Sequence, residues 1–470
     1  MNASDLVSAL RSTIGDTAVL TGADAEPAFT DWRKVYSGSA ICLVRPNSTE
    51  QVSDVMRICH DAGICVVPQG GNTGMSGGAT PSGDRPTLVL SLMRMNQIES
   101  VDKERYTITT QAGVSIQDLH EAAASVDRLF APDWGARGSA TIGGGMSTNA
   151  GGNNVLRYGN MRDQIMGLEV VLPDGRVWNG LRALRKDSSG YDLKQLFIGA
   201  EGTLGIVTRA TVKLHPATPN TQSALAALTS LDNLGGLFDL AREYAAESVT
   251  AFELVPNMGL TQVCKVFDLQ RPISTIEDFY VLIKVAAAQP VTDMIADFLS
   301  AAANAGLISD AIVAGTQDQE DRLWMIRDEL SPSGIYQHHD VGLKMDIAVP
   351  IDKIADYHDG VSAIASKIVP RAYTYGFGHI GDGNLHMMVM PFDDDYVDEF
   401  VSKKPELIAA IDEATFALGG TLSAEHGIGQ ELRARIGAQK SDLEWEMMRS
   451  IKAMFDPDGR MNPGKLFPPS

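Results

Sequence analysis

Two histidines stand close together in the stretch Gly378-His379-Ile380-Gly381-Asp382-Gly383-Asn384-Leu385-His386. Asp382-Gly383 is a strong hairpin signal, because a type I′ turn needs positive φ at both central positions. In that hairpin His379 would pair with His386, and directly opposed residues have Cβ atoms about 4.5–5.5 Å apart. Two imidazoles so placed could hold one metal ion. The alternative is that each histidine is an ordinary polar residue on an exposed sheet face.

The same region contains a misleading nucleotide motif. The run from Gly376 to Gly381 matches G-x-G-x-x-G. A dinucleotide fingerprint must open a helix, so that the pyrophosphate meets the helix N-terminus. Here the strand-like run Leu385 to Met390 follows instead, and we therefore reject the match.

Three glycine-rich stretches occupy the first half of the chain, at 68–78, 132–154 and 190–207. Exposed backbone N–H groups with few Cβ atoms suit an anion nest, which a diphosphate can approach closely. The first stretch is no Walker A loop, since it lacks Gly-Lys-Ser/Thr and a strand follows it. Separate clusters in one half of a chain indicate a long ligand with a charged middle. The alternatives are flexible surface loops and, for Glu201, a turn carboxylate.

Composition and charge narrow the function classes. A chain of 470 residues with 44% hydrophobic residues suggests two or three domains with ample core. The net charge of −20 argues against a general nucleic-acid or anionic-membrane surface, although a few local cations could still bind an anionic substrate. Solubility alone is the favoured reason for that charge.

The four cysteines form no C-x-x-C pair, so neither a thiolate zinc site nor an iron–sulfur cluster is indicated. We see no signal peptide and no transmembrane span, and the expected location is the cytoplasm.

The elements that would position further polar residues lie in the second half. A helix over 318–330 carries Arg327 in its last turn, where a cation also suits the helix dipole. Lys344 interrupts an apolar strand over 342–349, although a lysine on a half-exposed strand is usually only solvated. Glu425 and His426 precede Gly-Ile-Gly, which indicates irregular backbone and allows both side chains to enter one pocket.

The three glycine clusters resemble the FAD-binding half of the vanillyl-alcohol oxidase family of flavoproteins. The motifs P-x-G-G-x-T, T-I-G-G…N-A-G-G and G-A-E-G-T-L-G-I occur in order. Some relatives tether the flavin through a histidine in the first loop; this loop has none, so we expect non-covalent FAD. The resemblance implies that the flavin contacts are Pro68, Gly70, Gly71, Asn72, Thr73, Gly74, Thr141, Gly143, Gly144, Asn149, Gly151, Gly152, Glu201, Gly202, Gly205, Ile206 and Asn462.

The second half resembles the FAD-linked D-2-hydroxyacid dehydrogenases, a group that includes D-2-hydroxyglutarate, D-lactate and glycolate dehydrogenases. The motifs are G-H-x-G-D-G-N-x-H, S-A-E-H-G-I-G and N-P-G-K. The resemblance implies that His379, His386 and Glu425 bind a divalent metal, and two imidazoles with one carboxylate suit Zn²⁺. Another divalent ion such as Mn²⁺ is the alternative.

The resemblance also implies the remaining roles. His426 would be the base that removes the hydroxyl proton of the substrate. Arg327 and Lys344 would hold its carboxylates, with help from Ser331 and with Asn384 as a further contact. Asn384 could instead be only a turn residue. One departure concerns Met388, where the hydroxyglutarate branch is expected to have Asn; this difference weakens the hydroxyglutarate assignment.

The fold implied by the resemblance is α+β. It has a two-subdomain, PCMH-type FAD-binding domain and an α/β substrate or cap domain with an antiparallel sheet. The composition changes after His215-Pro216 to an α/β pattern without nucleotide signals, so we expect these domains at 1–216 and 217–420. A C-terminal helical segment at 421–470 would return to the flavin. The expected reaction is oxidation of a D-2-hydroxyacid to the 2-oxoacid, with hydride transfer to flavin N5.

The sequence does not decide the electron acceptor, the oligomeric state or the choice between related flavoprotein functions. The acceptor would be an electron-transfer flavoprotein or a quinone, and the chain could form a homodimer. The alternative functions are a non-redox FAD transferase of the alkyl-dihydroxyacetone-phosphate synthase type and an oxygen-using 2-hydroxyacid oxidase. No nucleic acid and no integral membrane segment are expected.

Overall fold

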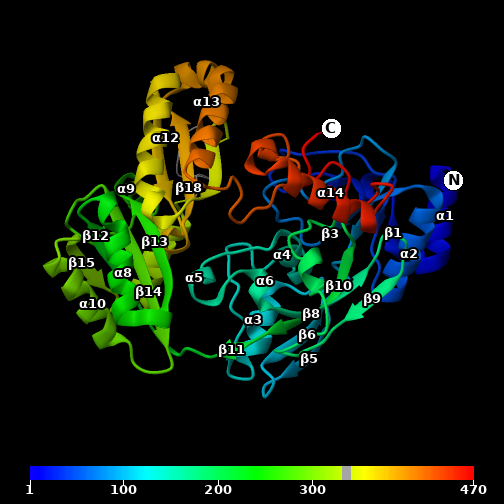
Figure 1. The fold of residues 1–470 in the computed structure, drawn as a ribbon, viewed down its shortest axis with the longest axis horizontal. Helices are drawn as coiled ribbons and strands as arrows, with labels where there is room; N and C mark the ends of the chain where they lie inside the picture. Colours follow the sequence, from blue (N-terminus) through cyan, green and yellow to red (C-terminus); the bar gives the residue numbers. More distant parts are fainter. Residues whose placement is uncertain (331–339, 470) are drawn as a thin grey trace. The chain divides into compact units, whose positions relative to one another are not determined.

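The computed structural model describes residues 1–330 and 340–469, which form two compact units (Figure 1). Unit 1 comprises Met1–Gly151, Gly159–Pro216 and Glu425–Ser470, and unit 2 comprises Gly152–Tyr158 and Ala217–Ala424. The short segment 152–158 therefore lies outside the unit to which the expected division at 1–216 assigns it. Ser331, one of the expected substrate contacts, lies outside the described residues.

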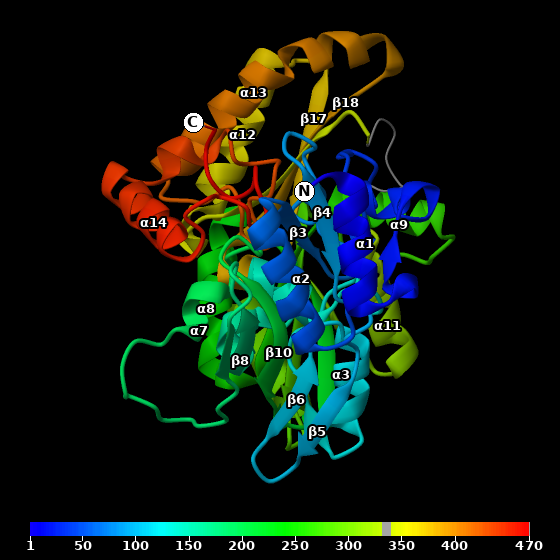
Figure 2. The same cartoon turned by 90° about the vertical axis from the view of Figure 1, so that its right-hand side faces the viewer.

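The first part of unit 1 is a small sheet with strand order β1-β2-β4-β3, in which β4 runs parallel to both β2 and β3. Helices α1 and α2 pack against each other (Figure 2), and Leu6, Val52 and Met56 share one core with the strands. The elements are α1 (Ala3–Ile14), β1 (Val19–Leu20), β2 (Leu43–Val44), α2 (Thr49–Ala62), β3 (Cys65–Gln69) and β4 (Thr87–Ser91).

The second part of unit 1 is an antiparallel sheet of order β5-β6-β10-β8-β9, with a separate two-stranded pair, β11 and β7. Apolar residues of β6, β8 and β10 share a core with α3 and α4. The elements are β5 (Ile98–Asp102), β6 (Thr107–Gln111), α3 (Ile116–Ala124), β7 (Arg128–Leu129), α4 (Ile142–Thr148), α6 (Met161–Gln164), β8 (Ile165–Val171), β9 (Val177–Gly180), α7 (Lys194–Phe197), β10 (Ile206–Lys213), β11 (His215–Pro216) and, from the C-terminal segment, α14 (Asp442–Phe455).

A buried carboxylate attaches the C-terminal segment to the rest of unit 1. Glu201 accepts hydrogen bonds from the backbone N–H groups of Ile428, at 2.7 Å, and Gly429, at 2.8 Å. Burial raises the pKa of Glu201, while these two amide bonds act in the opposite direction. Residues far apart in sequence are thereby joined by two hydrogen bonds to one buried side chain.

The first half of unit 2 is an antiparallel sheet of order β13-β14-β12-β15. Helices α8 and α10 pack in the core on one face (Figure 1), whereas α9 and α11 contribute to the core on the other. The elements are α5 (Val155–Tyr158), β12 (Asn220–Leu228), α8 (Leu234–Ala245), β13 (Val249–Pro256), α9 (Asn257–Val266), β14 (Phe279–Ala287), α10 (Thr292–Asn304), β15 (Ile308–Val313) and α11 (Gln317–Asp328).

The second half of unit 2 is a three-stranded antiparallel sheet of order β16-β18-β17. Helices α12 and α13 pack against each other, and α12 also contacts β17 (Figure 2). The elements are β16 (Leu343–Ala348), α12 (Ile354–Ile368), β17 (Ala372–Phe377), β18 (Asn384–Pro391) and α13 (Val397–Ala417).

The predicted pairing of the histidine hairpin is wrong in register. His386 pairs with Phe377, and β17 ends there. The connection is a loop with a 3-10 turn at Ile380–Asp382 instead of a two-residue type I′ turn. Ile380 is fully buried in the unit 2 core, so tertiary packing overrides the local Asp-Gly signal.

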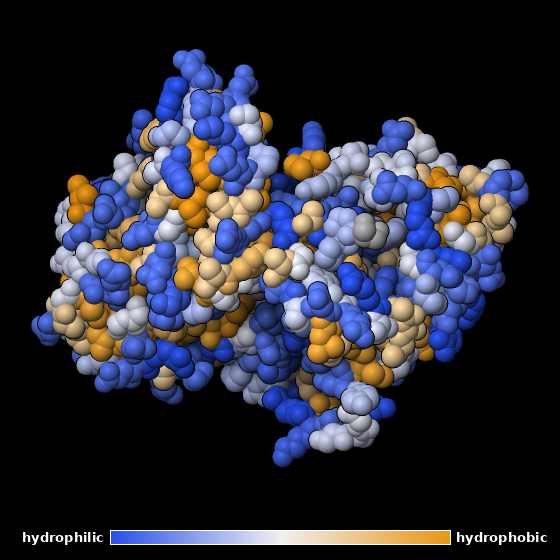
Figure 3. All heavy atoms as spheres, turned by 45° about the horizontal axis from the view of Figure 1, so that its top comes forward, coloured by the Kyte–Doolittle hydropathy of each residue, from blue (hydrophilic) through white to orange (hydrophobic). Residues whose placement is uncertain are grey.

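Hydrophilic side chains cover most of the face drawn in Figure 3, and hydrophobic residues lie between them in small groups. None of the helices in the described ranges is both long and apolar enough to cross a membrane.

We predict that Glu201→Ala destabilises unit 1 by about 3 kcal/mol, because leaving a buried donor without its acceptor costs about 1–3 kcal/mol. Two buried amide groups would lose their acceptor. Thermal unfolding together with hydrogen exchange at Ile428 and Gly429 measures the effect. Glu431→Ala is the control, since Glu431 is more exposed and its ion pair with Arg33 is long at 3.5 Å. Equal stability of the two variants would contradict the proposed role of Glu201 in attaching the C-terminal segment.

Candidate functional site

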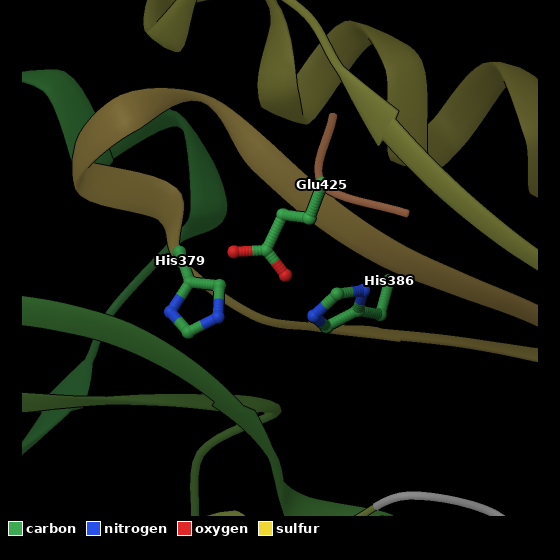
Figure 4. A group of neighbouring side chains, drawn as sticks. All are labelled: His379, His386 and Glu425. Carbon is green, nitrogen blue, oxygen red and sulfur yellow. The ribbon is translucent and has the colours of Figure 1, made fainter. Parts of the chain in front are cut away.

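Three side chains from distant parts of the sequence point toward one another (Figure 4). The potential ligand atoms of His379, His386 and Glu425 all lie within 4.8 Å of one another. The two imidazole rings have centroids 5.6 Å apart and are nearly perpendicular. The predicted group of two imidazoles and one carboxylate is therefore assembled, although through a loop and not through the predicted hairpin. Such a donor set suits Zn²⁺ or another divalent cation.

The main chain explains how Glu425 reaches the histidines. Residues 421–424 run along β16: Thr421 and Ala348 exchange backbone hydrogen bonds, and the N–H of Ala424 donates to the carbonyl of Asp346 at 3.1 Å. Glu425 is the next residue, so its position follows from the covalent chain. A second group with potential ligand atoms within 4.8 Å comprises Asp346, Glu425 and His426.

Each histidine has a carboxylate beside its Nδ1 atom. Glu253 Oε1 lies 2.8 Å from His379 Nδ1, and Asp346 Oδ1 lies 3.7 Å from His386 Nδ1. Only the His379 contact is short enough for a hydrogen bond. A neutral histidine that donates from Nδ1 to a carboxylate presents the lone pair of Nε2, which is the usual arrangement around a protein-bound metal. The residues present thus fit a divalent cation by donor chemistry and by the support behind the donors.

Arg327 belongs to the same buried group. Its Nε–H donates to Glu253 Oε2 at 2.7 Å, and its Nη2 lies 3.2 Å from His379 Nε2 and 3.5 Å from Nδ1. A donor on the Nε2 lone-pair axis would be much farther from Nδ1 than from Nε2. Arg327 Nη2 therefore lies beside the ring and off the lone-pair axis of Nε2.

The charges around Glu253 decide its protonation. Burial raises the pKa of this carboxyl, but the neighbouring His379 and Arg327 outweigh that effect and bring it to about 2. Glu253 is 1% exposed. It is an anion held by two partners in a site where an unpaired charge would be very unfavourable.

Lys344, Asp346 and His386 share one face of the three-stranded sheet, since Lys344 pairs with Met388 and Asp346 pairs with His386. Asn384, which we expect to contact the substrate, makes hydrogen bonds within the protein. Its Nδ2 group donates to Asp346 Oδ1 and to the carbonyl of Ile347. Its Oδ1 has no hydrogen-bond partner among the described residues. The structure thus gives Asn384 a structural contact to β16 and leaves one acceptor available.

In unit 1 the three glycine clusters meet. A Cβ atom on Gly70 would lie 2.3 Å from Thr141 Oγ1, and one on Gly71 would lie 1.9 Å from the carbonyl oxygen of Ser139. A Cβ on Gly202 would lie 2.5 Å from Pro68. Glycine is needed here because these main chains pack closely.

The first glycine loop leaves its backbone donors available. Within the described ranges, the N–H groups of Gly70, Gly71, Asn72, Thr73 and Gly74 have no acceptor in the protein. Asn72 has φ of 53°. Consecutive unused N–H groups in a loop that enters the left-handed region form an anion nest. This loop therefore fits the diphosphate of FAD.

Asn462 also fits the expected contact with the flavin. Its side chain is 2% exposed and donates through Nδ2 to the carbonyls of Gly78, at 2.9 Å, and Glu201, at 2.6 Å. Its Oδ1 has no partner in the part of the chain that the structure describes. The carboxylate of Glu201 and the Oδ1 of Asn149 are instead bonded to backbone amides, the latter to that of Arg162.

A basic pocket of about 350 Å³ lies in unit 1 and is lined by Arg85, Arg433, Lys452 and Lys465, among others. Lys452 is ion-paired with Asp456. Lys465 is 3% exposed, and its ammonium has only one long contact among the described residues, 3.4 Å to the carbonyl of Pro463. The pocket thus suits an anionic group.

The sequence reasoning missed two site residues, Glu253 and Asp346. Both are carboxylates inside otherwise apolar strands, in the runs Ala251-Phe252-Glu253-Leu254-Val255 and Met345-Asp346-Ile347. Charged residues are almost never fully buried unless they are paired. A lone acid in an apolar strand was therefore the signal that could have identified them.

Two protein-family models match the chain. The model of the C-terminal domain of FAD-linked oxidases matches residues 219–466, and a model of an FAD-binding domain matches residues 40–180. The mitochondrial D-2-hydroxyglutarate dehydrogenase of Danio rerio is 37% identical over 93% of this chain and 80% of its own length. A D-2-hydroxyglutarate–pyruvate transhydrogenase of Saccharomyces cerevisiae is 35% identical over 93% of this chain and 88% of its own length.

Solved structures share the fold at lower identity. A substrate complex of p-cresol methylhydroxylase has a TM-score of 0.77 at 16% identity and covers 98% of this chain and 96% of that protein. An alkyldihydroxyacetonephosphate synthase has a TM-score of 0.72 at 18% identity and covers 99% of this chain and 85% of that protein. These matches confirm the predicted two-domain FAD-oxidase architecture.

We predict that Lys465→Met stabilises the cofactor-free protein at pH 7. Burial and the nearby Arg433 lower the pKa of Lys465 to about 8, against about 10.4 for an unfolded lysine. Below pH 8 the folded state therefore bears the full cost of a buried ammonium, on the order of 3 kcal/mol. The cost declines as the pH rises from 8 to 10.4, because only the unfolded state then remains protonated.

Thermal unfolding in phosphate-free buffer between pH 6.5 and 10.5 checks this prediction. The matched control is Lys452→Met, which removes an ion pair with Asp456 and hydrogen bonds to the carbonyls of Thr203 and Met461, and should destabilise. A lower Tm for Lys465→Met than for the unmodified protein at pH 7 would refute the argument.

Proposed function

The chain belongs to the FAD-linked oxidases, and from this membership we propose that it is an FAD- and divalent-metal-dependent dehydrogenase that oxidises a D-2-hydroxyacid to the 2-oxoacid. The observation that supports this most strongly is the convergence of His379, His386 and Glu425 beside the cation Arg327. A metal-chelating group next to an anion-binding side chain matches a substrate that carries a hydroxyl and a carboxylate on adjacent carbons.

The overall reaction removes a hydride from the substrate Cα and a proton from its hydroxyl. FAD, when bound, supplies the two-electron acceptor that receives the hydride. The loop from Gly70 to Gly74 and the side chain of Asn462 would hold it. Electron-transfer flavoprotein or quinone as the final acceptor, and a homodimer, stay predictions.

The protein groups have separate tasks in this proposal. His379, His386 and Glu425 would hold the divalent cation, which when bound supplies positive charge that lowers the pKa of a substrate hydroxyl. Arg327 and Lys344 bind substrate carboxylate groups. His426 follows Glu425 in the chain and accepts the hydroxyl proton as general base, a contribution of about 10²–10⁴-fold in rate.

The backbone that follows His426 is held in place by hydrogen bonds. The hydroxyl of Ser76 donates to the carbonyl of Gly427 at 3.1 Å, and Glu201 binds the next two amides. Residues 427–429 are therefore fixed against the first glycine loop of unit 1. A base needs this kind of positional support to act at one defined proton.

We predict that His426→Ala retains FAD and metal but reduces the flavin about 10²–10⁴-fold more slowly, because the proton acceptor is missing. Anaerobic stopped-flow mixing with a panel of D- and L-2-hydroxyacids, with and without chelator, measures the bleaching of the flavin band. Unchanged reduction in His426→Ala would remove this residue from the mechanism.

The same assay separates the alternative functions. A non-redox FAD transferase would show no bleaching with any hydroxyacid in the unmodified protein. An oxygen-using oxidase would form peroxide in step with product when air is admitted. The match to an alkyldihydroxyacetonephosphate synthase supports only a shared fold, because its identity is 18%.

We predict that Met388→Asn raises kcat/KM for D-2-hydroxyglutarate relative to D-lactate by about tenfold. Met388 is 5% exposed and lies on the sheet face of Lys344 and His386. An apolar side chain offers no partner to a second carboxylate, and a discrimination based on a hydrogen bond is larger than one based on a methylene. Met388→Leu is the control and should leave the ratio unchanged. An unaltered ratio in Met388→Asn would show that this face does not contact the substrate's distal end.

A further inference from the structure

We infer that Glu253 is a positioning residue that fixes a metal ligand and a substrate cation with one carboxylate. The inference rests on the proposed function for the substrate role of Arg327, but its metal-binding part does not. Glu253 Oε1 lies 2.8 Å from His379 Nδ1, and Oε2 accepts from Arg327 Nε at 2.7 Å. Each oxygen thus serves a different functional group.

The fold gives Glu253 no freedom to turn away. Residues 249–256 of β13 are all buried, and the neighbouring Leu254 exchanges backbone hydrogen bonds with Gly378 at 2.9 and 3.3 Å. Gly378 precedes His379 in the chain. The two side chains are therefore set next to each other by a main-chain contact one residue away from each.

The contact with His379 decides which nitrogen can bind a metal. A carboxylate is only an acceptor, so the short Glu253–His379 bond requires the proton on Nδ1. In the neutral imidazole, Nε2 then carries the lone pair that a metal ion binds. The same contact increases the basicity of the imidazole, and such supporting carboxylates typically contribute about 10–100-fold to metal affinity.

The contact with Arg327 orients a planar donor. The side chain carries five N–H groups in a fixed geometry, and Glu253 occupies the Nε–H. The Arg327 guanidinium carbon is 5.7 Å from the centre of the Phe377 ring. Glu253 thus holds the guanidinium beside His379, with other N–H groups remaining for a carboxylate. Metal binding and substrate binding depend on the same buried anion.

Two substitutions separate the two functions of Glu253. Glu253→Ala removes both acceptors, and we expect about 10–100-fold weaker Co²⁺ binding together with a raised KM. Glu253→Gln keeps the shape but has one carbonyl oxygen, because its NH₂ group is a donor. It can accept from either His379 or Arg327 but not from both. We therefore expect either a Co²⁺ affinity at least tenfold weaker or a KM at least tenfold higher.

Glu320→Gln is the matched control. Glu320 is 6% exposed and is ion-paired with Lys284 at 3.0 Å, but its contacts are with Lys284 and Ser223. It tests whether the loss of any buried, paired carboxylate in unit 2 produces the same effect. We expect its Co²⁺ affinity and KM to stay within threefold of the unmodified protein.

The measurements are Co²⁺ titration of the metal-free, FAD-loaded protein, followed by calorimetry and by the visible Co²⁺ absorption bands, and steady-state kinetics with D-lactate and D-2-hydroxyglutarate. Wild-type-like Co²⁺ affinity, Co²⁺ spectrum and KM in both Glu253 variants would overturn the inference, as would equal losses in Glu320→Gln. If the unmodified protein itself binds no Co²⁺, the proposed metal site fails, which is a different result. The titration contains no substrate, so it tests the link to His379 whatever reaction the enzyme catalyses.

Discussion

The polar centre of unit 2 depends on one main-chain contact, the pair of hydrogen bonds between Leu254 and Gly378. β13 is the edge strand of the four-stranded sheet, and β17 is the edge strand of the three-stranded sheet. This contact joins the two edges at a single bridge. Glu253 and His379 flank the bridge, so joining the sheets also brings the carboxylate to the imidazole. Fold stability and ligand geometry are consequently determined by the same few atoms.

The parts of the molecule that were predicted correctly depend on local chemistry. Glycine clusters indicate exposed backbone N–H groups whatever surrounds them, and the N–H groups of Gly70 to Gly74 have no acceptor within the described ranges. The order of the clusters was sufficient to predict an FAD-binding architecture, which the family models confirm. The two histidines around a glycine-rich turn were also visible in the sequence, and the structure brings both within reach of Glu425, while the metal itself stays a prediction.

The parts that could not be predicted depend on packing between distant segments. The hairpin register followed from Asp382-Gly383 alone, but burial of Ile380 in the core of unit 2 determines the real loop. No sequence rule connects Glu253 with His379, since their proximity comes from the edge contact between two sheets. The segment 152–158 joins unit 2 because Leu156 packs against its core and Arg157 donates to the carbonyl of Ala286. A composition-based boundary has no access to either contact.

The attachment of the C-terminal segment through Glu201 and Asn462 has a consequence for biosynthesis. On the ribosome, the glycine loops emerge long before residues 425–470, which supply the amides for Glu201 and the side chain that reaches Gly78. Unit 2 ends at Ala424, so all of its residues are translated before this last segment of unit 1. Unit 2 therefore has all of its residues before unit 1 does, and Glu201 has no amide partners until residues 428 and 429 have emerged.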